Sequence, residues 1–274
     1  MKKIRVLLII LTLTILTVSS ICLSTFAKNG NKEIKDHQNT QITKPMSETH
    51  ATPVQPVVKN LGNGRLQIGN IIIDEIKNEV IVPGRLNMLE GPIEFIASTK
   101  GGMKLYETVL EMETDAMSFN LSMILLGLDP KKGKPAAYHF DPVPPQGDIV
   151  EISLQWDTED GKKSIQIQEI IHDMNTGKTL PVDQWVYTGS LFLDDGRYLA
   201  EEAGVLIGFV HDPASIIESS YSGKFPAYGT YVVNKNHSLS VGTEIQMVIK
   251  PIEMEEEGQV QKKEAGSKKQ EEMK

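Results

Sequence analysis

The stretch VEISLQWDTEDGKKSIQIQ, residues 150–168, predicts the fold class of this 274-residue chain. Apolar and polar residues alternate over residues 150–156, and this period of two is typical of a strand with one buried face. A turn-forming run at residues 157–161 follows, and the alternation resumes at Ile165 and Ile167. The stretch therefore predicts a β-hairpin that packs one face against a core.

Seven further segments are expected to form strands because they are rich in apolar and β-branched residues. They lie at residues 66–74, 80–83, 93–98, 185–193, 205–210, 230–233 and 245–249. Two turn-forming triplets, NTG at residues 175–177 and DDG at residues 194–196, separate some of them. No long helix alternates with these strands, so the pattern excludes the parallel α/β folds that bind nucleotides.

One segment carries a helical pattern instead. Thr114 or Asp115 can cap its beginning, and Gly127 fits its end. Its apolar residues recur at the spacing i, i+4, i+7 and i+8, at Met117, Leu121, Ile124 and Leu125. Further apolar residues, Phe119 and Met123 among them, cover most of its other sides, so we expect this helix to lie buried under the sheet.

A second, shorter helix is expected at residues 213–219, where Asp212 can act as the cap and Pro213 fits the first helical position. Strands outnumber helices in this expected fold. The expected architecture is therefore α+β, a single domain with a mostly antiparallel sheet and one buried central helix at about residues 115–126.

The first 27 residues are typical of an export signal. Three basic residues among the first five precede an apolar run, and Thr25-Phe-Ala27 offers a cleavage site with small residues at positions −3 and −1. We expect cleavage before Lys28 and an extracytoplasmic protein, either secreted or associated with the cell envelope.

Two alternatives to cleavage exist. The apolar stretch at residues 6–27 is 22 residues long. That is enough to cross a hydrocarbon core of about 30 Å as an uncleaved anchor. Lipid attachment at Cys22 would need a small residue before the cysteine, where this chain has Ile21. The sequence favours cleavage over both.

The composition of the exported chain excludes several kinds of chemistry and of partner. Cys22 is the only cysteine, so removal of the signal excludes disulfides, thiol catalysis and cysteine-bound metals. The signal also holds 3 of the 28 basic residues, which leaves 25 against 36 acidic ones, a net charge of −11. We expect no nucleic-acid partner and no membrane contact except through an uncleaved N-terminal segment, because such a charge repels anionic surfaces.

The chain after the signal divides into three parts. Residues 28–60 are polar, contain three prolines and show no periodicity, so we expect a disordered linker. Residues 61–252 have the length of one globular domain. Residues 253–274 repeat Glu and Lys almost without apolar residues and are expected to form a charged, disordered tail.

Four residues are the candidate ligand-binding set: Glu90, Glu107, His139 and Asp141. His139 and Asp141 are two positions apart, which on a strand places both on one face, where they could share a cation or position a water. Glu90 and Glu107 belong to a group of carboxylates that also could perform acid–base chemistry. We expect this group to form the water-facing side of a strand, and it further contains Glu94, Glu111 and Glu113.

Other candidates have simpler explanations. Phe140 and Pro142 indicate a strand end or a loop around His139, so we expect solvated polar groups there, and neither a metal nor a cofactor. The adjacent pairs His172-Asp173 and His211-Asp212 are typical of turns or caps. Four aromatic residues could form a sugar-binding platform, although such residues in strands usually lie in a core: Trp156, Trp185, Tyr187 and Phe192.

Several blocks, taken in order, resemble a known family. The run LEGPIEFIASTKGGMKLYETVL covers residues 89–110, LLGLDPKKGKPA covers residues 125–136 and DQWVYTGSLF covers residues 183–192. Together they resemble the YdjY-type domain of exported bacterial proteins, over roughly residues 61–251. The resemblance implies one extracytoplasmic domain of unassigned function. It also implies that relatives carry a histidine where this chain has Tyr106, so a chemical role of that histidine would be lost here.

No serine-hydrolase motif and no phosphate-binding loop accompanies these blocks. We therefore expect an exported, non-enzymatic binding or accessory module of the bacterial cell envelope, whose partner is an unidentified protein or envelope component. The alternative is an extracytoplasmic hydrolase or metal-assisted enzyme that uses carboxylates and His139. A membrane-tethered structural subunit is the third hypothesis.

Overall fold

The computed structural model describes residues 55–180, 184–221 and 228–252. The expected export signal, most of the expected linker and the expected tail lie outside these residues. Within them, no helix is long and apolar enough to cross a membrane. The described part of the chain is mostly strand with few helices, which agrees with the α+β class in its coarse form.

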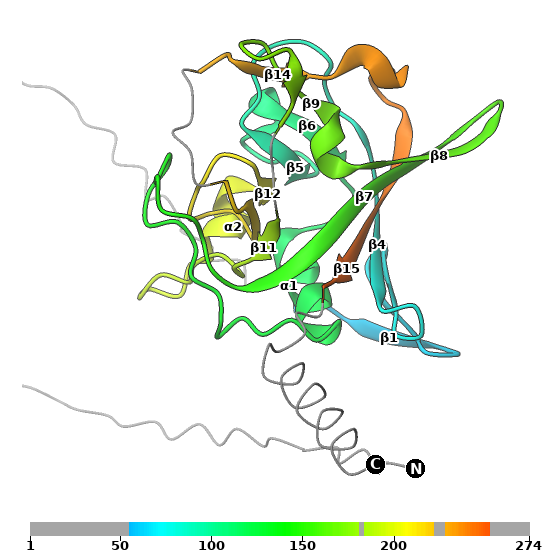
Figure 1. The fold of residues 1–274 in the computed structure, drawn as a ribbon. Helices are drawn as coiled ribbons and strands as arrows, with labels where there is room; N and C mark the ends of the chain where they lie inside the picture. The colour runs from blue at the N-terminus through cyan, green and yellow to red at the C-terminus, as the bar shows by residue number, and fades with distance from the viewer. Residues whose placement is uncertain (1–54, 181–183, 222–227, 253–274) are drawn as a thin grey trace, which may run out of the picture. The chain divides into compact units, whose positions relative to one another are not determined.

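Eight strands are joined by hydrogen bonds into a closed ring, much of which can be followed in Figure 1. The pairings lead from β4 through β15, β7, β11, β13, β12, β5 and β6 back to β4. Two pairs, β5–β6 and β12–β13, are parallel, and the other pairs of the ring are antiparallel. The strand bounds are β4 Glu79–Leu86, β15 Glu244–Pro251, β7 Asp148–Thr158, β11 Trp185–Tyr187, β13 Ile217–Ser219, β12 Val205–Gly208, β5 Phe95–Thr99 and β6 Thr108–Met112.

Further strands extend from this ring. β3 (Ile71–Asp74) pairs with β4, and β2 (Arg65–Ile68) and β1 (Val58–Gly62) follow outward. β8 (Gly161–Gln166) pairs with β7. A separate three-stranded sheet has the order β10 (Lys178–Thr179), β9 (Ile171–Asp173) and β14 (Tyr231–Val233). The three 3₁₀-helices are η1 Leu105–Glu107, η2 Ile167–Ile170 and η3 Lys235–His237. β1 starts at Val58, so the last residues of the expected linker take part in the sheet.

β4 closes the ring because its two halves have different neighbours on one edge. Residues 79–81 pair with β3, whereas residues 84–86 pair with β6. The change falls at Pro83, which has no N–H to donate and whose carbonyl accepts a bond of 2.9 Å from Glu113 N. The predicted end of this strand at Pro83 is therefore wrong, because the proline marks a change of partner and the strand continues to Leu86.

The hairpin predicted from residues 150–168 is confirmed as β7 and β8. Ile152 and Leu154 of β7 are fully buried and lie opposite Ile249 and Met247 of β15, which are also buried. Polar residues between them face outward, as the alternation predicts. The second strand ends earlier than expected, since Ile167 begins η2.

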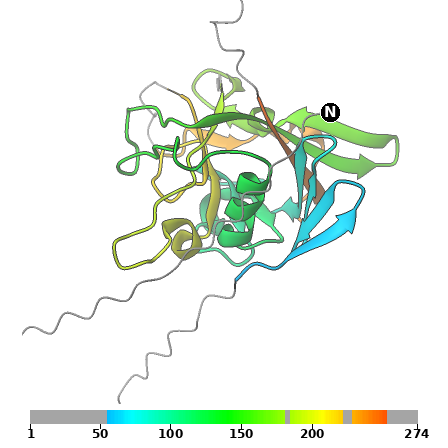
Figure 2. The same ribbon diagram turned by 90° about the horizontal axis from the view of Figure 1, so that it is seen from below.

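The longer predicted helix is present as α1 (Ala116–Leu125). Asp115 caps it, accepting a bond of 2.6 Å from Ser118 N. Phe119 and Met123 are fully buried, but Ile124 and Leu125 are 39% and 38% exposed, so the expected burial holds on one side only. Figure 2 shows α1 in green between the blue strands and α2 (Leu199–Ala203), in line with its contacts to β3, β12 and α2.

The second predicted helix, at residues 213–219, is wrong. Asp212 does accept a bond from Ala214 N at 2.8 Å, but it stabilises a turn and not a helix. The residues that follow are fully buried in and beside β13, where Ile217 pairs with Ile207 on one side and Tyr187 on the other. The second helix of the structure is α2, which ends at Gly204 in the left-handed conformation, with φ +69°.

Two predicted strands are shorter than expected for a local reason. The segment 66–74 is a hairpin, because Gly69 has φ +54° and reverses the chain between β2 and β3. The segment 185–193 leaves the sheet after Tyr187, since Gly189 and Ser190 have φ +78° and +58°. The remaining predicted strands correspond to β5, β12, β14 and β15, with ends shifted by up to two residues.

Replacing Gly84 by alanine tests the ring closure. A Cβ at this position would lie 2.6 Å from the carbonyl oxygen of Glu111 in β6, which is backbone and cannot move aside. We expect Gly84→Ala to lower the free energy of unfolding by about 2–3 kcal/mol, measured by urea denaturation. Ser164→Ala, at an exposed position of β8, is the control and should stay within about 0.5 kcal/mol of wild type. Equal stability of both variants would contradict the closure through β4 and β6.

Candidate functional site

Ionisable side chains from distant segments meet at one rim of the ring. β5 begins there, and its first residue pairs with Gly208, the last residue of the antiparallel strand β12. Glu94, directly before β5, donates its backbone N–H to the carbonyl of Glu107 at 3.0 Å. We use the name His139 cluster for Glu94, Lys104, Glu107, His139 and Asp212.

His139 lies between two carboxylates. Its Nδ1 is 2.7 Å from Asp212 Oδ2, and its Nε2 is 3.2 Å from Glu94 Oε2. The hydrogen bonds to Asp212 and Glu94 raise the pKa of His139 from 6.5 to about 9, although partial burial opposes this change. The imidazole is therefore protonated at neutral pH and donates from both nitrogens.

Lys104 forms the second charged pair of the cluster. Its Nζ is 2.7 Å from Glu107 Oε1 and 3.3 Å from Tyr106 Oη. Burial lowers the pKa of Lys104, but the hydrogen bonds that it donates to Glu107 and Tyr106 outweigh this and raise the pKa above its ordinary value. Nζ also lies 5.6 Å from the ring centroids of both Phe95 and Tyr106, within the range of a cation–π interaction.

The loop that carries His139 is closed at its base. Lys134 N donates to Gln146 O at 2.7 Å, and Gln146 N donates to Lys134 O at 3.0 Å. Residues 134–146 therefore form an Ω-loop, which we call the strap. Phe140 N in the strap donates to His211 O at 2.9 Å, so the strap is bound to the segment after β12 by main chain as well as by His139.

A buried carboxylate lies beneath the strap. Glu218 of β13 accepts a bond from Ala136 N at 3.2 Å and one from Asp212 N at 3.1 Å. Burial raises the pKa of Glu218 to about 8, although these two hydrogen bonds oppose the change. The fully buried His211 adds to this connection, with Nδ1 2.7 Å from Asp141 O and Nε2 3.0 Å from Ser219 O.

The structure brings two of the four predicted site residues together. Glu107 and His139 both belong to the cluster. Glu90 lies elsewhere, exposed and 2.9 Å from Lys235 Nζ. Asp141 does not share a ligand with His139, because its carboxylate accepts from Ala137 N and Val143 N inside the strap, which lowers its pKa.

The expected water-facing row of carboxylates is wrong for three of its members. Glu94, Glu107 and Glu111 are 6%, 3% and 6% exposed. Each is paired with a cation, and for Glu111 the partner is Arg85 in β4. Their alternation with apolar residues is real, but both sides of β5 and β6 are covered, so polar positions there are buried as well. Glu94 and Asp212 were missed as site residues, and their pairing with His139 leaves no local sequence signal.

Comparison with known proteins gives one match. The model of the YdjY domain matches residues 71–250 of the chain, which is more than half of its length. The chain belongs to the YdjY domain family. Curated proteins and solved structures yield no match. The predicted resemblance is thus confirmed, and the described fold is that of a YdjY domain.

The core position that is usual for strand aromatics is confirmed for three of the four candidate residues in this YdjY domain. Trp156, Trp185 and Tyr187 are buried, and the Oη of Tyr187 donates to Asn120 Oδ1 at 2.6 Å. Phe192 is 57% exposed and stacks on Tyr198. The four residues therefore do not form a common sugar-binding platform, since these strands bury three of the rings in the core.

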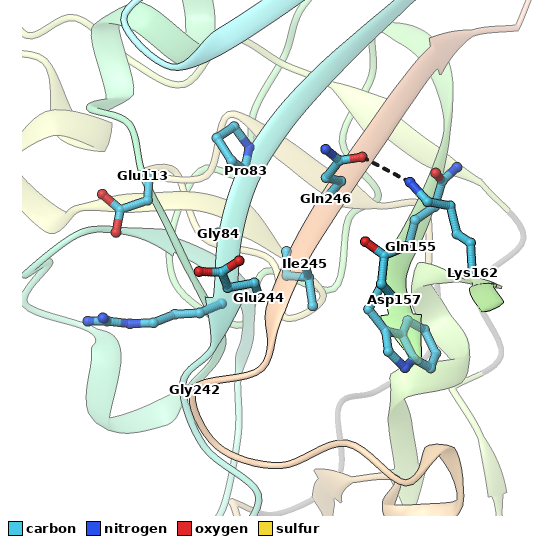
Figure 3. A pocket seen from close by; sticks show the side chains of 12 residues that line it. Pro83, Gly84, Glu113, Gln155, Asp157, Lys162, Gly242, Glu244, Ile245 and Gln246 are labelled. Atoms are coloured by element: carbon cyan, nitrogen blue, oxygen red, sulfur yellow. Dashed lines mark hydrogen bonds between the residues drawn. The ribbon is translucent and has the colours of Figure 1, made fainter. Parts of the chain in front are cut away.

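An open pocket of about 410 Å³ lies on the water-facing side of β4, β15 and β7 (Figure 3). Its side chains form polar cross-strand rows, with Gln246 opposite Pro83 and Gln155. Lys162 Nζ donates to Gln246 Oε1 at 3.4 Å, the bond drawn in Figure 3. Such rows are typical of the solvated side of an antiparallel sheet, so this YdjY domain has a stronger candidate site at the His139 cluster.

The remaining histidine–aspartate pairs of the YdjY domain have structural roles. Asp173 accepts bonds from Asn175 N and Thr176 Oγ1 and shapes the turn after β9. Asp212 is the exception, because it also binds His139. Among the described residues, no group of three or more His, Cys, Asp or Glu side chains has the arrangement of a metal site.

The raised pKa of His139 predicts a pH dependence of stability. A pKa that is higher in the folded state stabilises the fold fully below the unfolded value of 6.5 and loses this contribution as pH rises through about 9. We expect His139→Gln to destabilise the fold below pH 6.5 and much less above pH 9, measured by urea denaturation across this range. Asp212→Asn should flatten the profile in the same window. A variant that loses equal stability at both ends of the window would contradict the charged contact.

The raised pKa of Glu218 predicts that stability also depends on pH in a second, lower pH range. Its folded pKa of about 8 exceeds the ordinary 4.5, so folding favours the protonated carboxyl, and stability falls as pH rises from about 4.5 to about 8. We expect Glu218→Gln to remove this slope, whatever its effect on absolute stability. The measurement is the free energy of unfolding at pH values below 4.5, between 4.5 and 8, and above 8. An unchanged slope would show that Glu218 does not take up a proton on folding.

Proposed function

We propose that this YdjY domain is an exported, non-enzymatic binding or accessory module of the bacterial cell envelope, and that the His139 cluster is its working site. The observation that supports the proposal is the pairing of every ionisable group of the cluster with an opposite charge. In such a site the ion pairs fix the positions of the side chains, and neither His139 nor Lys104 is left as an unpaired base or nucleophile.

The protonation state of His139 argues against its use as a general base. A general base must be unprotonated near the working pH, whereas the pKa of His139 is about 9. Both of its nitrogens are also engaged, by Asp212 and by Glu94. Lys104 is held as a cation by Glu107, so it cannot act as a nucleophilic amine.

Export is part of the proposal because of the N-terminal sequence. The first 27 residues have the charge, apolar run and small residues of a cleavable signal. We further infer that residues 28–60 link the signal to one globular domain at about residues 61–252, in which α1 is the central helix. In this arrangement the charged residues 253–274 follow the domain as a tail.

A hydrolase remains the second candidate for a specific reason. Glu94 and Glu107 are buried carboxylates at the same rim, and their backbones are hydrogen-bonded at 3.0 Å. Paired carboxylates of this kind support glycoside hydrolysis when one of them is protonated at the working pH. Here each carboxylate is paired with a cation, Glu94 with His139 and Glu107 with Lys104.

An activity screen with the purified chain separates the two candidates. We expect ester, phosphate and glycoside substrates to be hydrolysed at the buffer rate by wild type, Glu94→Gln and Glu107→Gln alike. A general acid or base contributes about 10²–10⁴ to a rate. A wild-type rate above buffer that falls by about 10² in either variant would establish the hydrolase and refute the binding module.

A further inference from the structure

Exposed aromatic rings surround the His139 cluster. Tyr106 is 65% exposed, and its ring lies 5.6 Å from Lys104 Nζ. Phe140 of the strap is 37% exposed and meets the imidazole of His139 edge-on at 4.2 Å. The ring of Phe95 is fully buried and lies 6.4 Å from the ring of His139 and 5.6 Å from Lys104 Nζ. Tyr106 and Phe140 therefore place two exposed rings beside the charged pairs.

Tyr228 is a third exposed ring, on the segment that follows β13. It is 59% exposed, and its pKa is raised, first by desolvation and then by the negative charges of Glu107 and Glu94. Tyr106 and Lys104 also act on its hydroxyl, so Tyr228 lies near the cluster. Apolar surface of this kind, with polar groups among it, marks binding sites.

Each of the two buried carboxylates uses only one of its oxygens in a side-chain contact with the described residues. Within the described ranges, Glu94 is bonded through Oε2 to His139, and Glu107 through Oε1 to Lys104. Their second oxygens, Glu94 Oε1 and Glu107 Oε2, accept no side-chain hydrogen bond from these residues. Both residues are more than nine-tenths buried. An ionised carboxylate only accepts, so a ligand that completes these bonds must supply donors.

We propose that the rings and the open carboxylate oxygens bind a neutral oligosaccharide. Sugar hydroxyls are the donors that Glu94 and Glu107 require, and the C–H faces of sugar rings suit the exposed rings of Tyr106 and Tyr228. This inference rests on the proposed function, since it names the ligand of the same site.

The charges of the site favour a neutral ligand. Three carboxylates face two cations in the cluster, and the whole chain has a net charge of −8. An anionic glycan is repelled by this balance. A cationic glycan has to compete with Lys104 and His139, which already neutralise the carboxylates. A neutral ligand with hydroxyl groups is not repelled by the carboxylates and does not have to displace Lys104 or His139.

Titration of the full chain with four defined glycans tests this. The neutral probes are cellotetraose and the tetramer of N-acetylglucosamine, the anionic probe is tetragalacturonate and the cationic probe is the glucosamine tetramer. We expect at least one neutral probe to bind more tightly than both charged probes, measured by calorimetry. Tyr106→Ala and Tyr228→Ala should each weaken its binding about tenfold.

Two variants complete the design. Glu107→Gln keeps the shape of the side chain but removes the charge, and it should also weaken the neutral probe. Phe192→Ala removes another exposed ring, which stacks on Tyr198, and should leave binding unchanged within about twofold. Circular dichroism of each variant confirms that the fold is retained.

The outcomes separate this inference from the proposed function. Binding of no neutral probe at millimolar concentration overturns the inference. Binding that Tyr106→Ala and Tyr228→Ala leave intact also overturns it, as does preference for a charged probe. Cleavage of a bound probe supports the site but refutes a non-enzymatic module. Binding without cleavage, lost in the tyrosine variants and kept in Phe192→Ala, supports both.

Discussion

The structure depends on the division of one edge of β4 between β3 and β6. Pro83 supplies no N–H and Gly84 no side chain, and between them the strand changes partners. The change closes the ring, because β6 can then pair with β4 on one side and β5 on the other. With β5 and β6 parallel and β12 antiparallel to β5, the start of two strands and the end of a third meet at one rim.

At that rim, burial requires each charged side chain to have a partner. Glu94 and Glu107 come to lie almost without solvent, and a buried carboxylate is tolerated only beside a cation or hydrogen-bond donors. Lys104 pairs with Glu107 from three residues before it in the chain, whereas the partner of Glu94 is His139, which lies in the strap. The hydrogen bonds of His139 to Asp212 and to Glu94 raise the pKa of the imidazole, and they also hold the strap in its position.

Local patterns predicted the strands well and the site only partly. The alternation in β7 and the cap at Asp115 are local signals, and both held. The pair Asp212-Pro213 predicts a helix that is not present, because an Asp side chain that can cap a helix can also stabilise a turn. The buried pairing of Ile217 with Ile207 favours the turn followed by a strand. Residue type alone singles out His139 and Glu107, and the structure places both in one cluster. The contact of His139 with Asp212 has no local sequence signal, since the two are 73 residues apart and only the fold joins them.

His139 is a cation that holds the strap in place, because each of its two ring nitrogens contacts a carboxylate. Nitrogen-15 NMR of the imidazole in the full chain reports the protonation of each nitrogen. We expect protons on both Nδ1 and Nε2 at neutral pH, with loss of one of them at a pH of about 9. A ring with one unprotonated nitrogen at neutral pH would show that His139 is not a cation there, and it would make His139 able to act as a base.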